Sequence, residues 1–333
     1  MSDTDTSPAE LRTDCPPCER DRAGNPVVEV LSDREVPLGG PRGIAVRRTL
    51  PQRGRSLIGA WCFADHYGPA DVATAGGMDV ASHPHTGLQT ASWLFSGEVE
   101  HRDSSGVHAM VRPGELNLMT AGRGICHSEV STPATTTLHG VQLWVALPDT
   151  ARYAPRDFQH YAPAPHDLGG ATARVFLGAL GGAVSPVETF TPLLGAELQL
   201  PPRTRLDLEV DPDFEHGLLV DSQALVLGGT PLRRSQLGYL GTGLASLTVT
   251  NATDAPGRAL LLGGMPFGED ILMWWNFVGR SHEEIASFRV EWHNGSDRFG
   301  RVEGYRGTPD RLPAPPLPAI RMVPRRTAPP GSG

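Results

Sequence analysis

The chain has 333 residues and a formal net charge of −8, and all 29 of its basic residues are arginine because it contains no lysine. The absence of lysine excludes Schiff-base catalysis, pyridoxal phosphate anchoring and a P-loop, and the acidic balance argues against direct nucleic-acid binding. The length suits two domains, while 39 glycines and 31 prolines favour many short strands joined by tight turns over long helices.

Residues 1–24 are polar and lack a core-forming pattern, which predicts a disordered tail. This tail contains one Cys-x-x-Cys pair, Cys15 and Cys18. It could be half of a zinc site or a redox pair, but without a second such pair we interpret it as incidental. The polar start has no signal-peptide core, and no apolar run is long enough to cross a bilayer. We therefore expect a cytoplasmic monomer with reduced cysteines and no membrane contact.

Short apolar or alternating runs separated by glycine and proline occupy residues 25–150, and the same pattern resumes over residues 151–300. Such runs are typical of antiparallel barrels or sandwiches, so we predict an all-β protein with two barrels in tandem. One short helix is expected near the C-terminus, because Ser281 to Glu284 forms a capping box followed by Ile285, Phe288 and Trp292 at helical spacing. Residues 301–333 are Pro-rich and should form an extended tail that wraps the surface.

Two motifs carry the chemistry of the chain, His83-Pro84-His85 and His127-Ser128-Glu129. Residues at i and i+2 on a strand point to the same face, so each motif presents two side chains as a pair. Two facing pairs would supply three imidazoles and one carboxylate, a ligand set for a divalent transition metal that leaves coordination positions open. A His-x-His pair alone is as often structural as ligating. A second pair after a glycine-rich turn in the same domain makes metal binding the favoured interpretation.

The remaining histidines are assigned other roles. We interpret His101 as a turn or rim residue of the barrel and not as a ligand, while His66 either orients a ligand or packs as a polar core residue. Cys126 should point away from the metal-binding pairs and pack as an apolar residue. The histidines of the second half lack the paired spacing, so the second barrel is expected to hold no metal of this kind; they are His216, His282 and His293.

These motifs, taken together, resemble the pirin family of the cupin superfamily. The resemblance runs from about residue 27 to residue 299 and is carried by segments in both halves. They include Asp65-His66-Tyr67-Gly68-Pro69, His83 to Thr90, Gly97 to Ser104, Met119 to Glu129, Leu138 to Pro148, Leu262 to Glu269 and Trp274 to Val278. The resemblance implies a bicupin of two jelly-roll barrels, with the metal in the first.

Carried over residue by residue, the resemblance implies Fe(II) bound by His83, His85, His127 and Glu129, with Mn, Ni, Cu or Zn as alternatives that affinity alone does not exclude. Some pirin-like proteins act as quercetin 2,3-dioxygenases, while others are iron-dependent partners of transcription factors or metabolic enzymes. We therefore weigh a dioxygenase acting on a flavonol-like substrate, with Glu129 as its base, against a non-catalytic iron-responsive binding protein. Gln89 stands where pirins usually have Glu, which places in doubt any mechanism that needs a carboxylate there.

Overall fold

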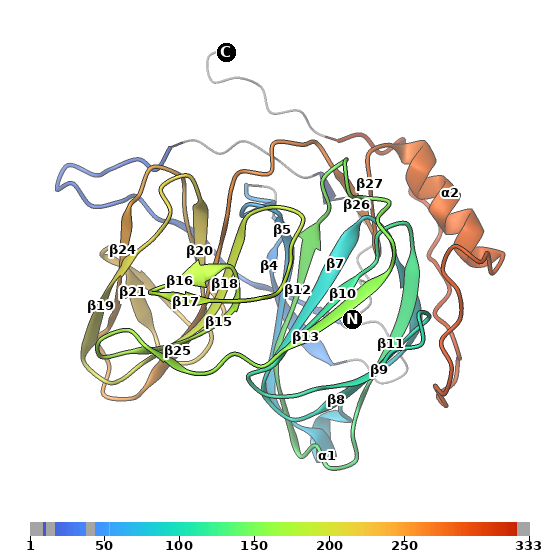
Figure 1. Ribbon diagram of the computed structural model, residues 1–333, viewed down its shortest axis with the longest axis horizontal. Helices are drawn as coiled ribbons and strands as arrows, with labels where there is room; N and C mark the ends of the chain where they lie inside the picture. The colour runs from blue at the N-terminus through green and yellow to red at the C-terminus, as the bar shows by residue number, and fades with distance from the viewer. Residues whose placement is uncertain (1–8, 11–16, 38–43, 53, 325–333) are drawn as a thin grey trace.

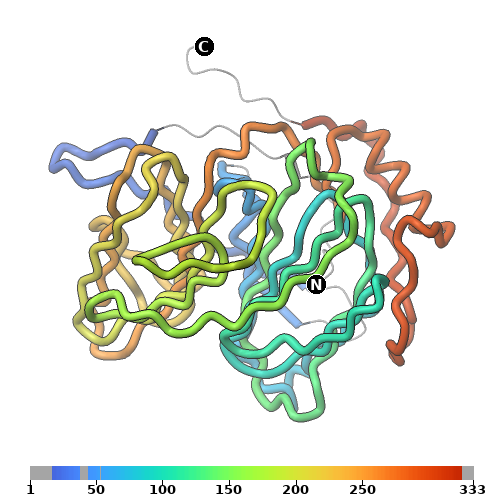
Figure 2. Tube along the Cα trace, in the orientation of Figure 1, coloured from blue at the N-terminus to red at the C-terminus, as the bar shows by residue number. Residues whose placement is uncertain are grey.

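The computed structural model describes residues 9–10, 17–37, 44–52 and 54–324. Within them the chain forms two β-barrels that lie side by side, each built from a seven-stranded and a four-stranded antiparallel sheet (Figure 1). The tube in Figure 2 shows residues of the first barrel in blue to green and those of the second in yellow to orange. The equal strand numbers confirm an all-β fold whose second half repeats the architecture of the first.

The first barrel carries the two predicted metal-binding motifs, both on its four-stranded sheet. This sheet has the strand order β6 (Asp79–His85), β11 (Ile125–Ser131), β8 (Val99–Asp103) and β9 (His108–Val111). Its seven-stranded sheet has the order β13 (Asp157–Tyr161), β10 (Leu116–Thr120), β7 (Leu88–Ser96), β12 (Thr137–Ala146), β5 (Trp61–Asp71), β4 (Ala45–Leu50) and β3 (Arg34–Pro37). A short helix, α1 (Val72–Ala75), follows β5, with Asp71 as its N-cap.

The second barrel repeats this arrangement with its own two sheets. The seven-stranded sheet has the order β14 (His166–Asp167), β15 (Thr172–Leu177), β18 (Leu193–Leu200), β25 (Gly257–Gly264), β20 (Glu215–Val220), β23 (Leu237–Leu240) and β2 (Glu29–Leu31). The four-stranded sheet has the order β19 (Thr204–Glu209), β24 (Ser246–Asn251), β21 (Leu225–Leu227) and β22 (Thr230–Leu232). Leucines at alternating strand positions line the interior of the second barrel, because successive side chains of a strand point to opposite faces.

Segments cross between the barrels, so the predicted boundaries at residues 25–150 and 151–300 do not follow the sheets. Strand β2 precedes the first barrel in sequence but pairs with β23 of the second. Strand β13 lies beyond residue 150 but pairs with β10 of the first. The hairpin of β26 (Leu272–Trp274) and β27 (Phe277–Gly279) also reaches the first barrel, because the Val278 amide donates to the Thr86 carbonyl at 3.0 Å.

The described part of residues 1–24 differs from the disordered tail that the sequence predicts. Ala9–Glu10 form strand β1, which pairs with β26. The Cys18 amide donates to the Thr242 carbonyl at 2.8 Å, and the Cys18 side chain packs on the second barrel. Cys15 lies outside the described residues. The sequence of this segment is polar and does not predict this pairing, because its partners lie more than 200 residues away.

The C-terminal region supports the first barrel from outside. Helix α2 (His282–His293) begins at the predicted capping box, where the Ser281 hydroxyl accepts from the Glu284 amide, and it buries Ile285, Phe288 and Trp292 as predicted. The Trp292 indole donates to the Leu312 carbonyl at 2.8 Å, which fixes the following segment. Residues 301–324 therefore wrap the outer face of the barrel, as the Pro-rich composition predicts.

One hydrophobic cluster joins the barrels across their seven-stranded sheets, and Trp93 is one of its members. The Trp93 indole donates to Glu197 of the second barrel at 2.8 Å, so a buried carboxylate meets a buried donor there. The short strands β16 (Ala179–Leu180) and β17 (Ala183–Val184) pair with each other as a hairpin. Among the described residues, no helix combines the length and the hydropathy that crossing a bilayer requires.

Candidate metal centre

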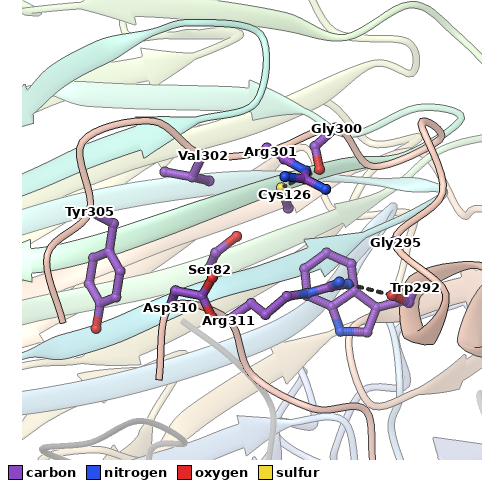
Figure 3. Close-up of a pocket in the computed structure, with 10 residues that line it drawn as sticks. All are labelled: Ser82, Cys126, Trp292, Gly295, Gly300, Arg301, Val302, Tyr305, Asp310 and Arg311. Carbon is purple, nitrogen blue, oxygen red and sulfur yellow. Dashed lines mark hydrogen bonds between the residues drawn. The ribbon is translucent and has the colours of Figure 1, made fainter. Parts of the chain in front are cut away.

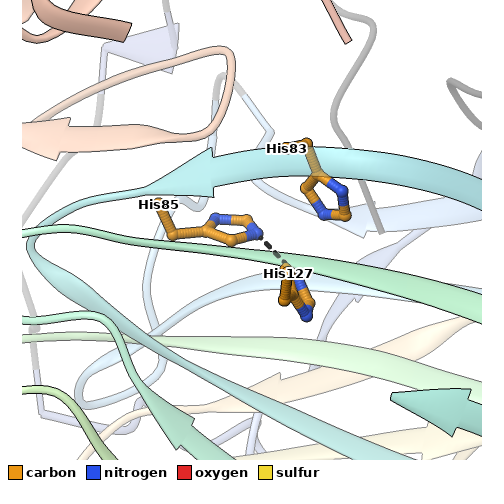
Figure 4. Close-up of side chains that lie close together, drawn as sticks. All are labelled: His83, His85 and His127. Atoms are coloured by element: carbon orange, nitrogen blue, oxygen red, sulfur yellow. Dashed lines mark hydrogen bonds between the residues drawn. The ribbon is translucent and has the colours of Figure 1, made fainter. Parts of the chain in front are cut away.

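Three histidines converge inside the first barrel, His83 and His85 from β6 and His127 from β11 (Figure 4). All three are fully buried, and one nitrogen of each lies within 4.8 Å of the other two. His83 and His127 are direct cross-strand partners, while the two residues of the His83/His85 pair point to the same face, as strand alternation predicts. Burial lowers the pKa of all three imidazoles well below the ordinary value for histidine, which keeps them neutral.

Hydrogen bonds outside the cluster fix how two of these rings are oriented. The Nδ1–H of His83 donates to the Ala81 carbonyl at 2.9 Å, which leaves its Nε2 lone pair facing the cluster. His127 Nδ1 lies 3.3 Å from His101 Nδ1, and His101 Nε2 lies 3.2 Å from an oxygen of Asp103. If His101 donates to Asp103, it accepts from His127, and the Nε2 lone pair of His127 also faces the cluster.

His101 is not the rim residue that the sequence suggests, because its side chain is buried beside His127. It lies on β8, directly opposite Glu129 of β11. Burial opposes ionisation of Asp103, but hydrogen bonds from His101 and Ser105 outweigh it and lower the pKa of that carboxyl. The sequence signal that could have revealed His101 is its i, i+2 spacing with Asp103 on the strand that pairs with β11.

Glu129 lies in the same buried region but at one end of the histidine cluster. It groups with His101 and His127 and is 2% exposed. A register shift between β11 and β6 separates it from His83 and His85, since His127 pairs with His83 whereas Glu129 pairs with Val80. Burial and the nearby Glu129 carboxylate raise the pKa of Tyr67 above the ordinary tyrosine value. The structure thus brings the three histidines together and places Glu129 beside His127, at the edge of the histidine cluster.

His66 and His139 belong to a separate cluster between the two barrels. His66 Nε2 and His139 Nε2 lie 2.7 and 2.6 Å from one oxygen of Asp221, and Arg258 binds the other oxygen at 2.7 Å. His66 Nδ1 faces the Ser235 hydroxyl at 3.0 Å. His66 is therefore a polar packing residue, the second of its two predicted roles.

Gln89 does not face the histidines. It pairs with Val145 of β12, which belongs to the hydrophobic cluster between the barrels, and its amide donates to Thr120 at 3.0 Å. The adjacent pair, Thr90 with Trp144, faces inward, because the rings of Trp144 and His85 lie 5.1 Å apart. The turn at Thr86 and Gly87 shifts the alternation, so the residue four positions after His85 points out of the barrel.

Cys126 faces outward, as strand alternation predicts, onto a cavity of about 350 Å³ (Figure 3). This cavity lies between the outer face of the four-stranded sheet and the C-terminal segment, and it is lined by Ser82, Cys126, Trp292, Arg301, Tyr305 and Arg311 among others. Burial raises the pKa of the Cys126 thiol, which favours its unreactive protonated form. The cavity is therefore separated from the histidines by the sheet itself.

The buried nitrogens fit a divalent cation. Within the described residues, His83 Nε2 has no hydrogen-bond partner, and such a buried polar atom is costly unless something binds it. His85 Nε2 and His127 Nε2 are 3.1 Å apart. Two imidazole nitrogens have about this separation when both bind one cation at roughly 2.1 Å and near a right angle. Neutral imidazoles with an adjacent carboxylate suit Fe, Ni, Cu, Mn or Zn.

Comparisons with known proteins identify the family of the chain. The Pirin family model matches residues 43–145, and the model of the pirin C-terminal cupin domain matches residues 195–300. A Pseudomonas aeruginosa protein, provisionally named quercetin 2,3-dioxygenase, is 45% identical over 293 residues, which cover 88% of this chain and 91% of that protein.

Solved structures show the same fold. A quercetin 2,3-dioxygenase from Acinetobacter baumannii superposes with a TM-score of 0.84 at 37% identity, covering 90% of this chain and 98% of that chain. A bacterial pirin from Escherichia coli, solved in complex with nickel(II), has a TM-score of 0.56 at 16% identity, covering 72% of this chain and 99% of that one. At that identity the second likeness concerns the fold alone.

Proposed function

Because the chain belongs to the pirin family of cupin proteins, we propose that its first barrel holds one divalent metal, with Fe(II) favoured, through His83, His85, His127 and Glu129. The observation that carries this proposal is the set of three buried histidines: His83 Nε2 has no hydrogen-bond partner among the described residues, and His85 Nε2 and His127 Nε2 face each other at 3.1 Å. Glu129 supplies the carboxylate from two positions beyond His127 on β11. When bound, such a metal supplies a Lewis acid and a redox centre.

We further propose that the protein is a dioxygenase acting on a flavonol-like substrate. Two similar proteins bear the name quercetin 2,3-dioxygenase, and both are covered almost completely by this chain. A flavonol carries a hydroxyl next to a carbonyl, a pair that can chelate a metal once the hydroxyl loses its proton. In a dioxygenase reaction both atoms of O2 enter the organic product, so no external reductant is required.

The protein residues have separate roles in this scheme. Glu129 accepts the proton of the substrate hydroxyl, since it is the carboxylate that lies with the histidines. His101 and Asp103 orient His127 through the hydrogen bonds described above. The ring of Trp144, stacked on Phe63 with centroids 4.0 Å apart, borders His85 and keeps that side of the site apolar.

The proposal is tested by following quercetin decay and O2 uptake under air with iron-loaded protein. We expect decay faster than with free iron at equal concentration, and incorporation of both atoms of labelled O2 into the product. Decay no faster than with free iron would reject the dioxygenase and favour the alternative, a metal-dependent binding protein.

A further inference from the structure

A row of polar side chains crosses the inner face of the seven-stranded sheet of the first barrel, opposite the histidines. Its members are direct cross-strand neighbours on five successive strands, and all are at least nine-tenths buried. In strand order from β10 through β7, β12 and β5 to β4 they are Asn117, Ser92, Gln142, Asp65 and Arg48. We call this set the polar row. A continuous polar line is unusual inside a barrel whose outer neighbours are apolar.

The position of the polar row follows from the inner rows on either side of it. Trp144, two residues after Gln142 on β12, lies against His85. In the other direction Gly140 pairs with Tyr67, which packs in one cluster with Val80, the cross-strand partner of Glu129. His85 and Glu129 mark the two ends of the candidate metal centre, so the polar row faces its middle. The two sheets of such a barrel pack about 10 Å apart, a gap that one bound molecule can bridge.

Most groups of the polar row are satisfied within the protein. Arg48 and Asp65 form a two-point ion pair with N···O distances of 2.7 and 2.9 Å, and the Ser92 hydroxyl donates to Gln142 Oε1 at 2.9 Å. The exception is Gln142 Nε2, which is buried and finds no hydrogen-bond partner in the described chain. If the amide were rotated by 180°, its oxygen would take that place, so one polar atom of Gln142 lacks a partner either way.

We propose that Gln142 is a specificity residue that hydrogen-bonds an oxygen atom of the substrate bound at the metal centre. This inference rests on the proposed function, because it assigns a partner within the same site. A buried amide atom without a partner costs free energy, and a ligand oxygen recovers it. An amide can donate to a carbonyl or accept from a hydroxyl, and a flavonol offers both.

The charges of the polar row narrow the class of ligand. Arg48 is neutralised by Asp65, so the row offers no unpaired cation to a carboxylate or phosphate. The adjacent row is aromatic, with Phe63 stacked on Trp144, and Arg48 lies 4.2 Å above the Phe63 ring. Such a wall suits a flat aromatic ligand with neutral oxygen substituents better than a free organic acid.

The test compares two matched substitutions, Gln142→Met and Gln89→Met. Both remove a buried amide of equal size, but Gln89 faces away from the histidines. Quercetin affinity is measured without oxygen on iron-loaded protein, from the visible absorption of the ligand, after metal content and melting temperature are recorded. We expect Gln142→Met to weaken quercetin binding by roughly threefold to tenfold at unchanged metal content, the usual effect of one neutral hydrogen bond, and Gln89→Met to leave it unchanged.

Each outcome distinguishes the two proposals. If wild type binds quercetin and both variants bind it equally well, Gln142 has no role in recognition, while the proposed function stands. If wild type does not bind quercetin beyond what free iron does, both proposals fail. Should Gln142→Met not fold, Ser92→Ala removes the hydroxyl that holds the amide, and unchanged quercetin affinity in that variant would overturn the inference.

Discussion

His83 and His127 are cross-strand partners, with ring centroids 4.3 Å apart, although 44 positions separate them in the sequence. The candidate metal centre is therefore divided between two adjacent strands. Strand β6 is at the edge of its sheet, so the segment that lies along its free edge helps to stabilise its position. That segment is the C-terminal segment, since the Leu312 amide donates to the Ser82 carbonyl at 2.8 Å.

Removing the C-terminal segment should weaken metal binding. A chain ended at Gly304 loses both backbone hydrogen bonds to Ser82, including that from the Ser82 amide to the Asp310 carbonyl at 3.3 Å. Because each bond contributes about 1 kcal/mol, their loss should lower metal affinity by up to roughly thirtyfold, and the melting temperature should drop. Ile320→Ala, at a residue 68% exposed in the same segment, serves as the control. Equal metal affinity in the shortened and full-length chains, measured by chelator competition, would show that the segment does not support β6.

Glu129→Gln should retain the shape of the site and remove its base. We expect turnover of quercetin to fall by about 10²- to 10⁴-fold, the usual contribution of general-base catalysis. The measurement is steady-state O2 uptake at matched metal content. Gln89→Glu, which introduces a carboxylate on the outward face of β7, should not raise activity. A Glu129→Gln enzyme with wild-type turnover would remove Glu129 from the mechanism.

Asp221→Asn should destabilise the contact between the barrels. The Asp221 carboxylate is 1% exposed and receives His66 and Arg258, so its loss leaves buried donors unmatched. The expected loss in unfolding free energy is about 3–5 kcal/mol, typical for breaking a buried charged pair. Asp207→Asn, at an ion pair whose carboxylate is 60% exposed, should change stability by less than about 0.5 kcal/mol. Chemical denaturation of both variants makes the comparison, and equal stabilities would contradict it.

His216 should make the protein less stable in mild acid. Burial lowers its pKa to about 4, below the ordinary value of 6.5, and neither ring nitrogen has a hydrogen-bond partner among the described residues. The unfolded state therefore takes up the proton first. Stability is complete above pH 6.5 and falls as the pH approaches 4. Between pH 7 and pH 5 the wild type should lose about 2 kcal/mol more than His216→Gln.

The control for His216 is His108→Gln, the same change at a histidine whose side chain is 46% exposed. Its unfolding free energy should follow that of the wild type at both pH values. Identical pH dependence in wild type and His216→Gln would show that His216 does not titrate between the folded and unfolded states.

Local pattern predicted the parts of the fold that depend on neighbouring residues. Alternation along β6 and β11 placed His83 beside His85 and directed Cys126 outward. The capping box located helix α2 at Ser281. The resemblance associated Gln89 with the site, but the turn that precedes β7 directs this residue to the other face of the strand.

Features that depend on distant partners were not predictable from one sequence. The polar row exists because the registers of five strands coincide, and no local pattern reports that Ser92 faces Gln142. The order of the Cys18 segment depends on Thr242 in the same way. His101 was misassigned because its burial follows from pairing with β11 rather than from its own neighbours.

The most direct test of the metal centre is the metal content of purified protein, measured by inductively coupled plasma mass spectrometry. The account predicts one metal per chain in wild type and in the control His108→Ala, and none in the double variant His83→Ala/His127→Ala. Full metal occupancy in that double variant would contradict the assignment of the metal to the first barrel.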